Sequence, residues 1–199
     1  MSTINTTNLK NPSSGSNNVV LNADGSATIA TLSGTTITGT SVRGGITSGT
    51  AVASTSGTSI DFTGIPSWVK RITVMFSGVS TNGTSRVQLQ LGTSSGFETS
   101  SYLGSIQTAT STSNFSAGFL TTDNASGTAA YVRHGLICIS ALGSNAWVAS
   151  INMGLSNQGD TWCGAGSKTL SGTLDRIRIT TVNGTDTFDA GTVNILYEG

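Results

Sequence analysis

Few residues in this 199-residue chain have side chains that could carry out chemistry. His134 is the only histidine, and Cys138 and Cys163 are the only cysteines. A zinc site built from these residue types needs a Cys-x-x-Cys or paired-histidine spacing, which the three positions lack. A Ser–His–Asp triad would need a serine and a carboxylate beside the one histidine in space. We therefore expect His134 to be structural, both thiols to be unpaired, and the chain to need no metal or other cofactor.

Carboxylates are sparse, with nine Asp and Glu residues in total. Glycan hydrolysis uses a pair of carboxyl groups, and the sequence shows no compact acidic cluster. Asp123, Asp160 and Asp186 are isolated, which excludes a calcium loop of the EF-hand type. We expect the chain not to be an enzyme. A glycan depolymerase on a β scaffold remains a third hypothesis for its function, and changing Asp160 or Glu98 would then abolish the activity.

The segment 157–164 is the best candidate for a binding loop. It combines amide, carboxylate and aromatic side chains, which can hydrogen-bond to sugars and stack on them. Its candidate binding residues are Asn157, Asp160 and Trp162. The alternative interpretation is a β-strand whose Trp162 packs in the core of the domain.

Composition indicates the elements that must position these residues. Charged residues make up 9% of the chain, against roughly 25% in ordinary globular proteins. The net charge is zero, so the basic surface of a nucleic-acid binder is missing. No apolar run approaches the ~20 residues that cross a bilayer, and no signal-peptide pattern opens the chain, so we expect no membrane insertion. Ser and Thr total 63 and Gly adds 26, which disfavours helices and predicts an all-β protein.

Residues 1–50 differ from the rest of the chain, because they hold three charges and no aromatic residue. A five-residue spacing recurs among their glycines and among their apolar residues. An odd period flips faces on a flat strand, so the repeat predicts an extended, intertwined β stalk in which chains complete one another's core. A flexible linker is the alternative. The stalk residues would be Leu32, Ile37, Val42, Gly34, Gly39 and Gly44.

Residues 51–199 are expected to form one β-sandwich with a jelly-roll-like arrangement, because alternating strands recur with turn signals between them. The expected core faces hold Ile72, Val74 and Phe76; Val87, Leu89 and Leu91; Trp147, Ala149, Ile151 and Met153; Ile177 and Ile179; and Val193, Ile195 and Tyr197. Asn82-Gly83 and Asn183-Gly184 predict hairpin turns between the strands that flank them. Residues 65–68 predict a turn in which Trp68 covers the end of the sandwich, and residues 188–191 predict a bulge before the last strand.

Two stretches carry a resemblance to a known family. SGTSIDFTGIPSWVKRITVMFSGVSTNGTS (residues 56–85) and LDRIRITTVNGTDTFDAGTVNILYEG (residues 174–199) resemble the start and the end of the C-terminal β-domain of tail fibre proteins of tailed bacteriophages. The opening NLKNPSSGSNNVVLNADGSATIA (residues 8–30) is similar to a short module that often precedes such domains. The motifs that carry the resemblance are Asp61-Phe62, Ile65-Pro66-Ser67-Trp68 and Phe188-Asp189-Ala190-Gly191.

The resemblance implies a structural protein of the virion, usually a homotrimer, that often recognises the host and has no catalytic residues. The leading hypothesis is a tail fibre or spike subunit. Residues 1–50 would bind other virion proteins and sister chains, while residues 51–199 would bind a glycan or protein of the host cell surface. A capsid decoration, cement or head-fibre protein is the alternative, because location on the particle is not encoded in the sequence. The protein would be made in the bacterial host cytoplasm and would act in the virion.

Overall fold

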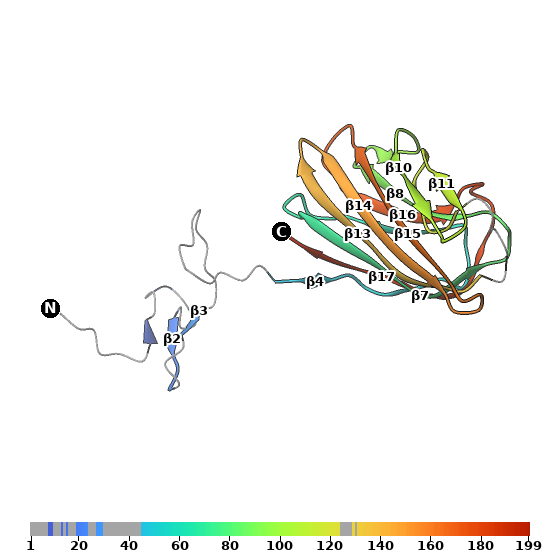
Figure 1. Ribbon diagram of the computed structural model, residues 1–199. Helices are drawn as coiled ribbons and strands as arrows, with labels where there is room; N and C mark the ends of the chain where they lie inside the picture. Colours follow the sequence, from blue (N-terminus) through green and yellow to red (C-terminus); the bar gives the residue numbers. More distant parts are fainter. Residues whose placement is uncertain are drawn as a thin grey trace. The chain divides into compact units, whose positions relative to one another are not determined.

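The chain divides into two compact units, Met1–Arg43 and Gly44–Gly199. The computed structural model describes residues 8–9, 13, 15, 19–23, 27–29, 45–123, 129 and 131–199 (Figure 1). In the first unit, β1 (Asn8–Leu9), β2 (Val19–Leu21) and β3 (Ala27–Ile29) form an antiparallel sheet in that order. The expected stalk residues Leu32, Gly34, Ile37, Gly39, Val42 and Gly44 lie outside the described residues.

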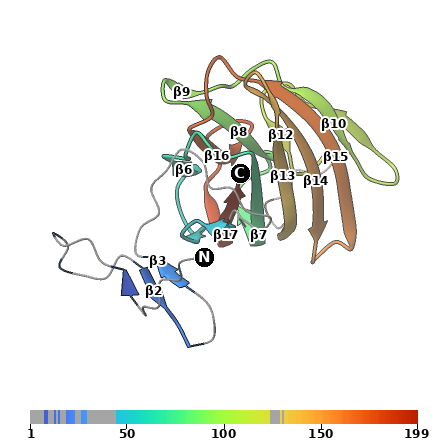
Figure 2. The same cartoon turned by 90° about the vertical axis from the view of Figure 1, so that its left-hand side faces the viewer.

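The second unit is built from two antiparallel sheets, and its described residues contain no helix (Figure 2). The large sheet runs in the order β11 (Thr112–Asn114), β10 (Leu103–Gln107), β15 (Asp160–Thr169), β14 (Ala146–Leu155), β13 (Arg133–Gly143), β7 (Arg71–Thr81), β17 (Phe188–Glu198) and β4 (Thr47–Ser48), with β5 (Val52–Ala53) also paired to β17. The small sheet runs in the order β12 (Phe119–Leu120), β8 (Val87–Thr93), β16 (Arg176–Thr181) and β6 (Ser59–Thr63), with β9 (Gly96–Phe97) paired to β8. The protein is therefore all-β in its described part, as expected, and its two sheets are consistent with a β-sandwich.

One continuous core lies between the two sheets, because buried residues of both belong to a single cluster. Val74 and Ile137 come from the large sheet, and Leu89 and Ile177 come from the small one; none of the four is exposed. The predicted inward faces of β7, β8, β14 and β16 are confirmed, since the residues expected there are all at most 6% exposed. The local alternation of a strand thus decides which side chains reach the core.

The two predicted hairpins are wrong. Asn82-Gly83 joins β7 to β8, and Asn183-Gly184 joins β16 to β17, but each of these strand pairs is split between the large and the small sheet. Asn-Gly favours a tight turn, yet it does not fix whether the flanking strands pair. The two loops contact each other instead: the Thr187 N–H donates to Asn82 Oδ1 at 2.9 Å, and the Ser85 N–H donates to Asp186 Oδ2 at 2.8 Å.

A two-residue hairpin turn does occur between β13 and β14. Gly143 pairs with Ala146, and the turn residues Ser144 and Asn145 have φ of 50° and 61°. Positive φ at both positions is the signature of a type I′ turn, whose twist matches that of the strands it joins. Asn145 tolerates this conformation, but Ser-Asn is a weak sequence signal for it.

The turn predicted at residues 65–68 and the bulge predicted at residues 188–191 are both present, whereas Trp68 is not buried. After Pro66, the Val69 N–H donates to the Pro66 carbonyl at 3.1 Å and closes a turn, while the Trp68 ring lies 5.9 Å from the Tyr197 ring and is 49% exposed. In β17, the register shifts between Phe188 and Ala190 and again between Ala190 and Thr192, so the bulge is confirmed.

The sheet of the second unit begins a few residues before the expected boundary at residue 51. Thr47 pairs with Tyr197, and Ser48 pairs with Leu196, so β4 is an edge strand of the large sheet. The Gly49 N–H then donates to the Ile195 carbonyl at 2.8 Å, which continues this edge pairing.

Candidate functional site

The predicted binding segment forms the turn between β14 and β15. Leu155 pairs with Asp160, and Asn157 Oδ1 accepts a hydrogen bond from the Val132 N–H at 3.2 Å. Asn157 and Asp160 are both exposed. Trp162 is 0% exposed and belongs to the core. Its ring therefore cannot stack on a sugar, and the alternative interpretation of a packed tryptophan is the one that the structure has.

A shallow depression of about 480 Å³ lies beside this turn. Its lining includes His134, Leu155 and Asp160, so the structure brings the only histidine to the same surface as a predicted site residue. His134 Nδ1 accepts a hydrogen bond from the Gly78 N–H at 3.3 Å, which fixes the imidazole against the neighbouring strand. Among the described residues that line this depression, no serine is paired with His134 and no second carboxylate is present, so these residues offer a contact surface and no assembled acid–base pair.

The chain also contains a sequence pattern that is associated with catalysis in other folds. Gly92-Thr93-Ser94-Ser95-Gly96 matches the Gly-x-Ser-x-Gly pattern of a nucleophile elbow. In that elbow the serine stands between a strand and a helix. Here Thr93 pairs with Gly96, so Ser94 and Ser95 form the turn between β8 and β9. The pattern is therefore a hairpin turn in this fold.

The two carboxylates of the depolymerase hypothesis lie far apart. Glu98 Oε2 is 2.5 Å from Lys168 Nζ, and Lys168 stands eight positions after Asp160 on the same strand. A strand rises about 3.3 Å per residue, so Asp160 lies roughly 26 Å from Lys168 along β15. Paired glycosidase carboxyls are about 5–9.5 Å apart. Glu98 and Asp160 therefore cannot act together on one glycosidic bond.

Glu98 itself is held as an anion by its neighbours. Partial burial acts to raise its pKa, but hydrogen bonds from Lys168, from the Ser171 N–H and from the Ser171 hydroxyl outweigh burial and lower the pKa below its ordinary value. The two Ser171 hydrogen bonds to Oε1 are 2.8 and 2.7 Å long. A carboxylate with a lowered pKa is a poor general acid, so this cluster is a structural clamp between the β9–β10 connection and the end of β15.

The cysteines and the acidic residues form no metal centre in the described ranges. Cys138 and Cys163 are free thiols, as expected. Among the residues that the structure describes, no group of three or more His, Cys, Asp or Glu side chains could hold a metal ion. The same residues include no helix that could span a bilayer.

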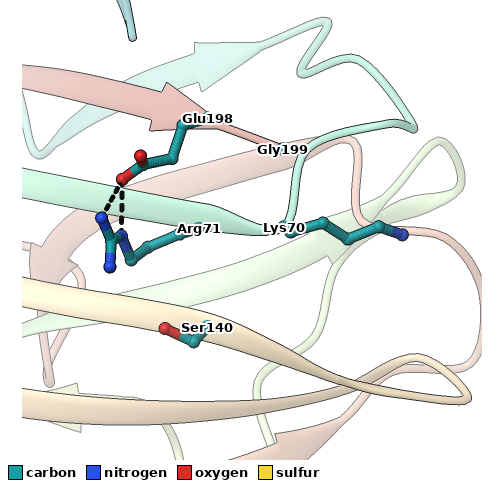
Figure 3. Close-up of a pocket in the computed structure, with 5 residues that line it drawn as sticks. All are labelled: Lys70, Arg71, Ser140, Glu198 and Gly199. Carbon is teal, nitrogen blue, oxygen red and sulfur yellow. Dashed lines mark hydrogen bonds and ion pairs between the residues drawn. The ribbon is translucent and has the colours of Figure 1, made fainter. Parts of the chain in front are cut away.

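A second depression lies where the last strand meets the start of β7. Arg71 donates from both Nε and Nη2 to Glu198 Oε1, at 2.5 Å each (Figure 3). The Lys70 side chain points away from this pair (Figure 3). The Arg71 and Glu198 side chains are 53% and 31% exposed, and ion pairs so open to water contribute little to stability or recognition. This depression of about 440 Å³ therefore carries no strong case for a site.

A polar groove of about 400 Å³ lies on the face of the small sheet that points away from the core. The polar groove is defined here by two cross-strand rows, Ser59–Thr180–Gln88 and Asp61–Arg178–Gln90. All of these except Asp61 line it, together with Thr99, Ala117, Val182 and Asn183. Sequence alternation placed Gln88, Gln90 and Arg178 on the outward side of their strands, but it gave no reason to bring them together.

Hydrogen bonds fix most of the groove side chains. Arg178 donates to both carboxylate oxygens of Asp61, at 2.8 and 2.6 Å, and its guanidinium lies 4.0 Å from the centre of the Phe97 ring. Gln90 Nε2 donates to the Ala117 carbonyl at 3.0 Å. Thr180 Oγ1 donates to the Thr58 carbonyl at 2.9 Å. The groove is therefore a pre-formed hydrogen-bonding surface.

Comparison with protein-family models, with curated proteins and with solved structures finds no match for this chain.

Proposed function

We propose that this chain is a structural subunit of a bacteriophage virion, a tail fibre or spike, which binds the surface of the host cell. The single observation that carries the proposal is the order of its strands. One sheet contains the neighbours β5-β17-β7-β13, and the other contains β6-β16-β8-β12. When only these eight strands are followed along the chain, each is succeeded by a strand of the other sheet, except that β8 is succeeded by its sheet neighbour β12. This order supports the proposed jelly-roll arrangement, an architecture of viral structural proteins and lectins.

The additional strands are compatible with the proposed jelly roll. β14 and β15 continue the large sheet beyond β13, and β10 and β11 extend it further. Both insertions thus widen one sheet and leave the order of the smaller sheet intact. A broad sandwich of this kind is suited to presenting loops and outer faces to a partner.

The division of the chain into two units fits a subunit that is anchored at one end. Residues 1–50 would attach to other virion proteins and intertwine with sister chains in a homotrimeric stalk. Residues 51–199 would project and contact a glycan or protein of the host. Three weak sites on one particle gain avidity through linkage, so no single site needs high affinity. The low content of charged residues fits extensive burial against neighbouring copies.

Immunogold electron microscopy of intact particles tests this proposal, with antibodies against residues 51–199. We expect label at the tail or its tip. Label over the head would replace the tail proposal with a capsid decoration protein, and absence of label from purified particles would overturn the virion assignment. Light scattering of the purified full chain gives an independent readout, for which we expect the mass of a trimer; a monomer would contradict the stalk.

A further inference from the structure

We infer that the polar groove is a binding site for an uncharged sugar unit of a surface glycan. This inference rests on the proposed function, and it adds the location of the site, its residues and the chemical class of its ligand. The groove combines neutral amide and hydroxyl groups with a single ion pair. Those groups form hydrogen bonds of the kind that sugar hydroxyls need.

Gln88 is the strongest indication of a ligand. Gln88 lines the groove and is only 3% exposed, and its carboxamide atoms are not among the fully buried, unpartnered polar atoms of the described residues. At the wall of the groove, this amide can both donate to and accept from a molecule outside the chain. Water can fill that role in the free protein, and a ligand hydroxyl can replace the water while keeping its hydrogen bonds.

The neighbouring groups are oriented to complete the same contact. Gln90 donates from its Nε2 to the Ala117 carbonyl, which leaves its Oε1 as a hydrogen-bond acceptor. Thr180 uses its hydroxyl proton on the Thr58 carbonyl, so its oxygen is left as an acceptor. Gln88 adds both a donor and an acceptor. Sugar hydroxyls act as donor and acceptor at once, which matches this mixed set.

Charge in the groove indicates which sugars fit. Among the described residues that line the groove, Arg178 alone is charged, and Asp61 binds it through two hydrogen bonds. Since the guanidinium is already neutralised, the groove offers no spare cation for a phosphate or a uronate. The geometry therefore selects neutral hexoses or N-acetylhexosamines over acidic sugars.

The size of the site fits a short stretch of glycan. A volume of about 400 Å³ falls within the roughly 300–1,000 Å³ of small-molecule sites. A smaller depression of about 110 Å³ shares Gln88, Ala117 and Val182 with the groove, so Gln88 stands at the junction of the two. Val182 is 42% exposed and lines both, which provides an apolar contact for the C–H face of a sugar ring.

The test uses the full chain and a panel of neutral hexose and N-acetylhexosamine oligosaccharides, with uronate-containing and phosphorylated oligosaccharides as comparators. Gln88→Leu and Thr180→Val remove hydrogen-bonding groups at nearly constant volume. Gln107→Leu is the matched control, because Gln107 is an exposed residue of β10 in the other sheet. We expect the wild type and Gln107→Leu to bind a neutral oligosaccharide, and each groove variant to bind it about tenfold or more weakly.

Adsorption of the labelled full chain to host cells, measured in parallel, separates this inference from the function on which it rests. Cell adsorption that is equal in the wild type and both groove variants would overturn the groove and leave the proposed function standing. Binding only to acidic oligosaccharides, or to none in the panel, would also overturn the inference. A wild-type chain that does not adsorb to host cells would contradict the proposed function, whatever its glycan binding. Thermal unfolding of each variant confirms that lost binding is not lost folding.

Discussion

The clamp between Glu98 and Lys168 provides the sharpest test of the energetics of this fold. The Lys168 side chain is only 5% exposed and that of Glu98 20% exposed, and their charged atoms are 2.5 Å apart. Replacing Glu98 with Gln keeps an oxygen that can accept from Ser171 but leaves Lys168 buried without a counter-charge. Hydrogen bonds to charged groups contribute about 1.5–3 kcal/mol, and breaking a fully buried ion pair costs about 3–5 kcal/mol.

Because the pair is partly open to water at Glu98, we expect Glu98→Gln to lower the free energy of unfolding by about 2–3 kcal/mol. For a domain of this size that corresponds to a fall in Tm of about 5–10 °C. Differential scanning calorimetry at neutral pH measures it. Glu198→Gln is the matched control, because it removes the same charge from the exposed pair with Arg71. The control should lose at most about 3 °C.

The reasoning would be refuted by equal shifts in the two variants, or by a larger shift for Glu198→Gln. Either result would mean that burial of Lys168 does not set the strength of the pair. Urea titration of the same proteins checks the assumption of a common unfolded state, because the slope of the unfolding free energy should be unchanged between them.

Three other predictions follow from named contacts. The pKa of Glu98 is lower in the folded chain than its ordinary value of 4.5, so the unfolded chain binds that proton more tightly. The free energy of unfolding should therefore fall as the pH drops from about 4.5 through the lowered pKa, and it should fall less steeply in Glu98→Gln. Urea unfolding at a series of pH values measures both slopes. Tyr102→Phe should cost about 1–3 kcal/mol in chemical denaturation, because the Tyr102 oxygen accepts from the buried Leu91 N–H at 2.6 Å. Gly191→Ala should lower Tm, since Gly191 has φ of 96° and an added Cβ would lie 2.4 Å from the Gly78 carbonyl oxygen, whereas Gly15→Ala, where nothing lies nearby, should not.

The strands could be predicted from the sequence because their alternation is a local property. Val87, Leu89 and Leu91 are all buried, and their positions two residues apart are enough to identify the inward face of β8. Local alternation does not show which strands pair with one another. β7 and β8 follow each other in the chain but lie in opposite sheets, and β7 pairs instead with β17, more than a hundred residues away. Nothing in the Asn82-Gly83 dipeptide distinguishes a hairpin from a crossing between sheets.

The face of Trp162 could not be decided from the sequence, because its strand has no clear alternation. Its inward positions hold Trp162, Gly164, Gly166 and Lys168. The glycines are required by close packing, since an added Cβ at Gly166 would lie 2.8 Å from the Phe115 ring. Lys168 is inward because Glu98 binds it. Because tryptophan, two glycines and lysine give no hydrophobic periodicity, the sequence does not show whether Trp162 is exposed or buried.

In the polar groove, a side chain can face away from the core and still be shielded from solvent. Alternation correctly turns Gln88 away from the core, but the side chain is 3% exposed. The carbonyl of Leu89 and the side chain of Gln88 pack within 3 Å of where a Cβ of Gly118 would stand, so the segment around residue 118 covers the strand closely. Gly118 immediately precedes β12, which pairs with β8 from a distant part of the sequence, and no short-range pattern predicts that pairing.

The thermal stability of a Gln88 variant distinguishes a ligand-binding role of this residue from a structural one. The carboxamide of Gln88 lines the groove and is not among the buried unpartnered groups of the described residues, so replacing it with a leucine of similar size should change Tm by no more than a few degrees. A binding role predicts that this variant loses affinity for the neutral oligosaccharide at the same time. If Gln88→Leu instead lowers Tm by several degrees while keeping the affinity, Gln88 is a structural residue, and the groove is only a furrow between strands. Calorimetry and oligosaccharide titration on one preparation of the variant decide between the two.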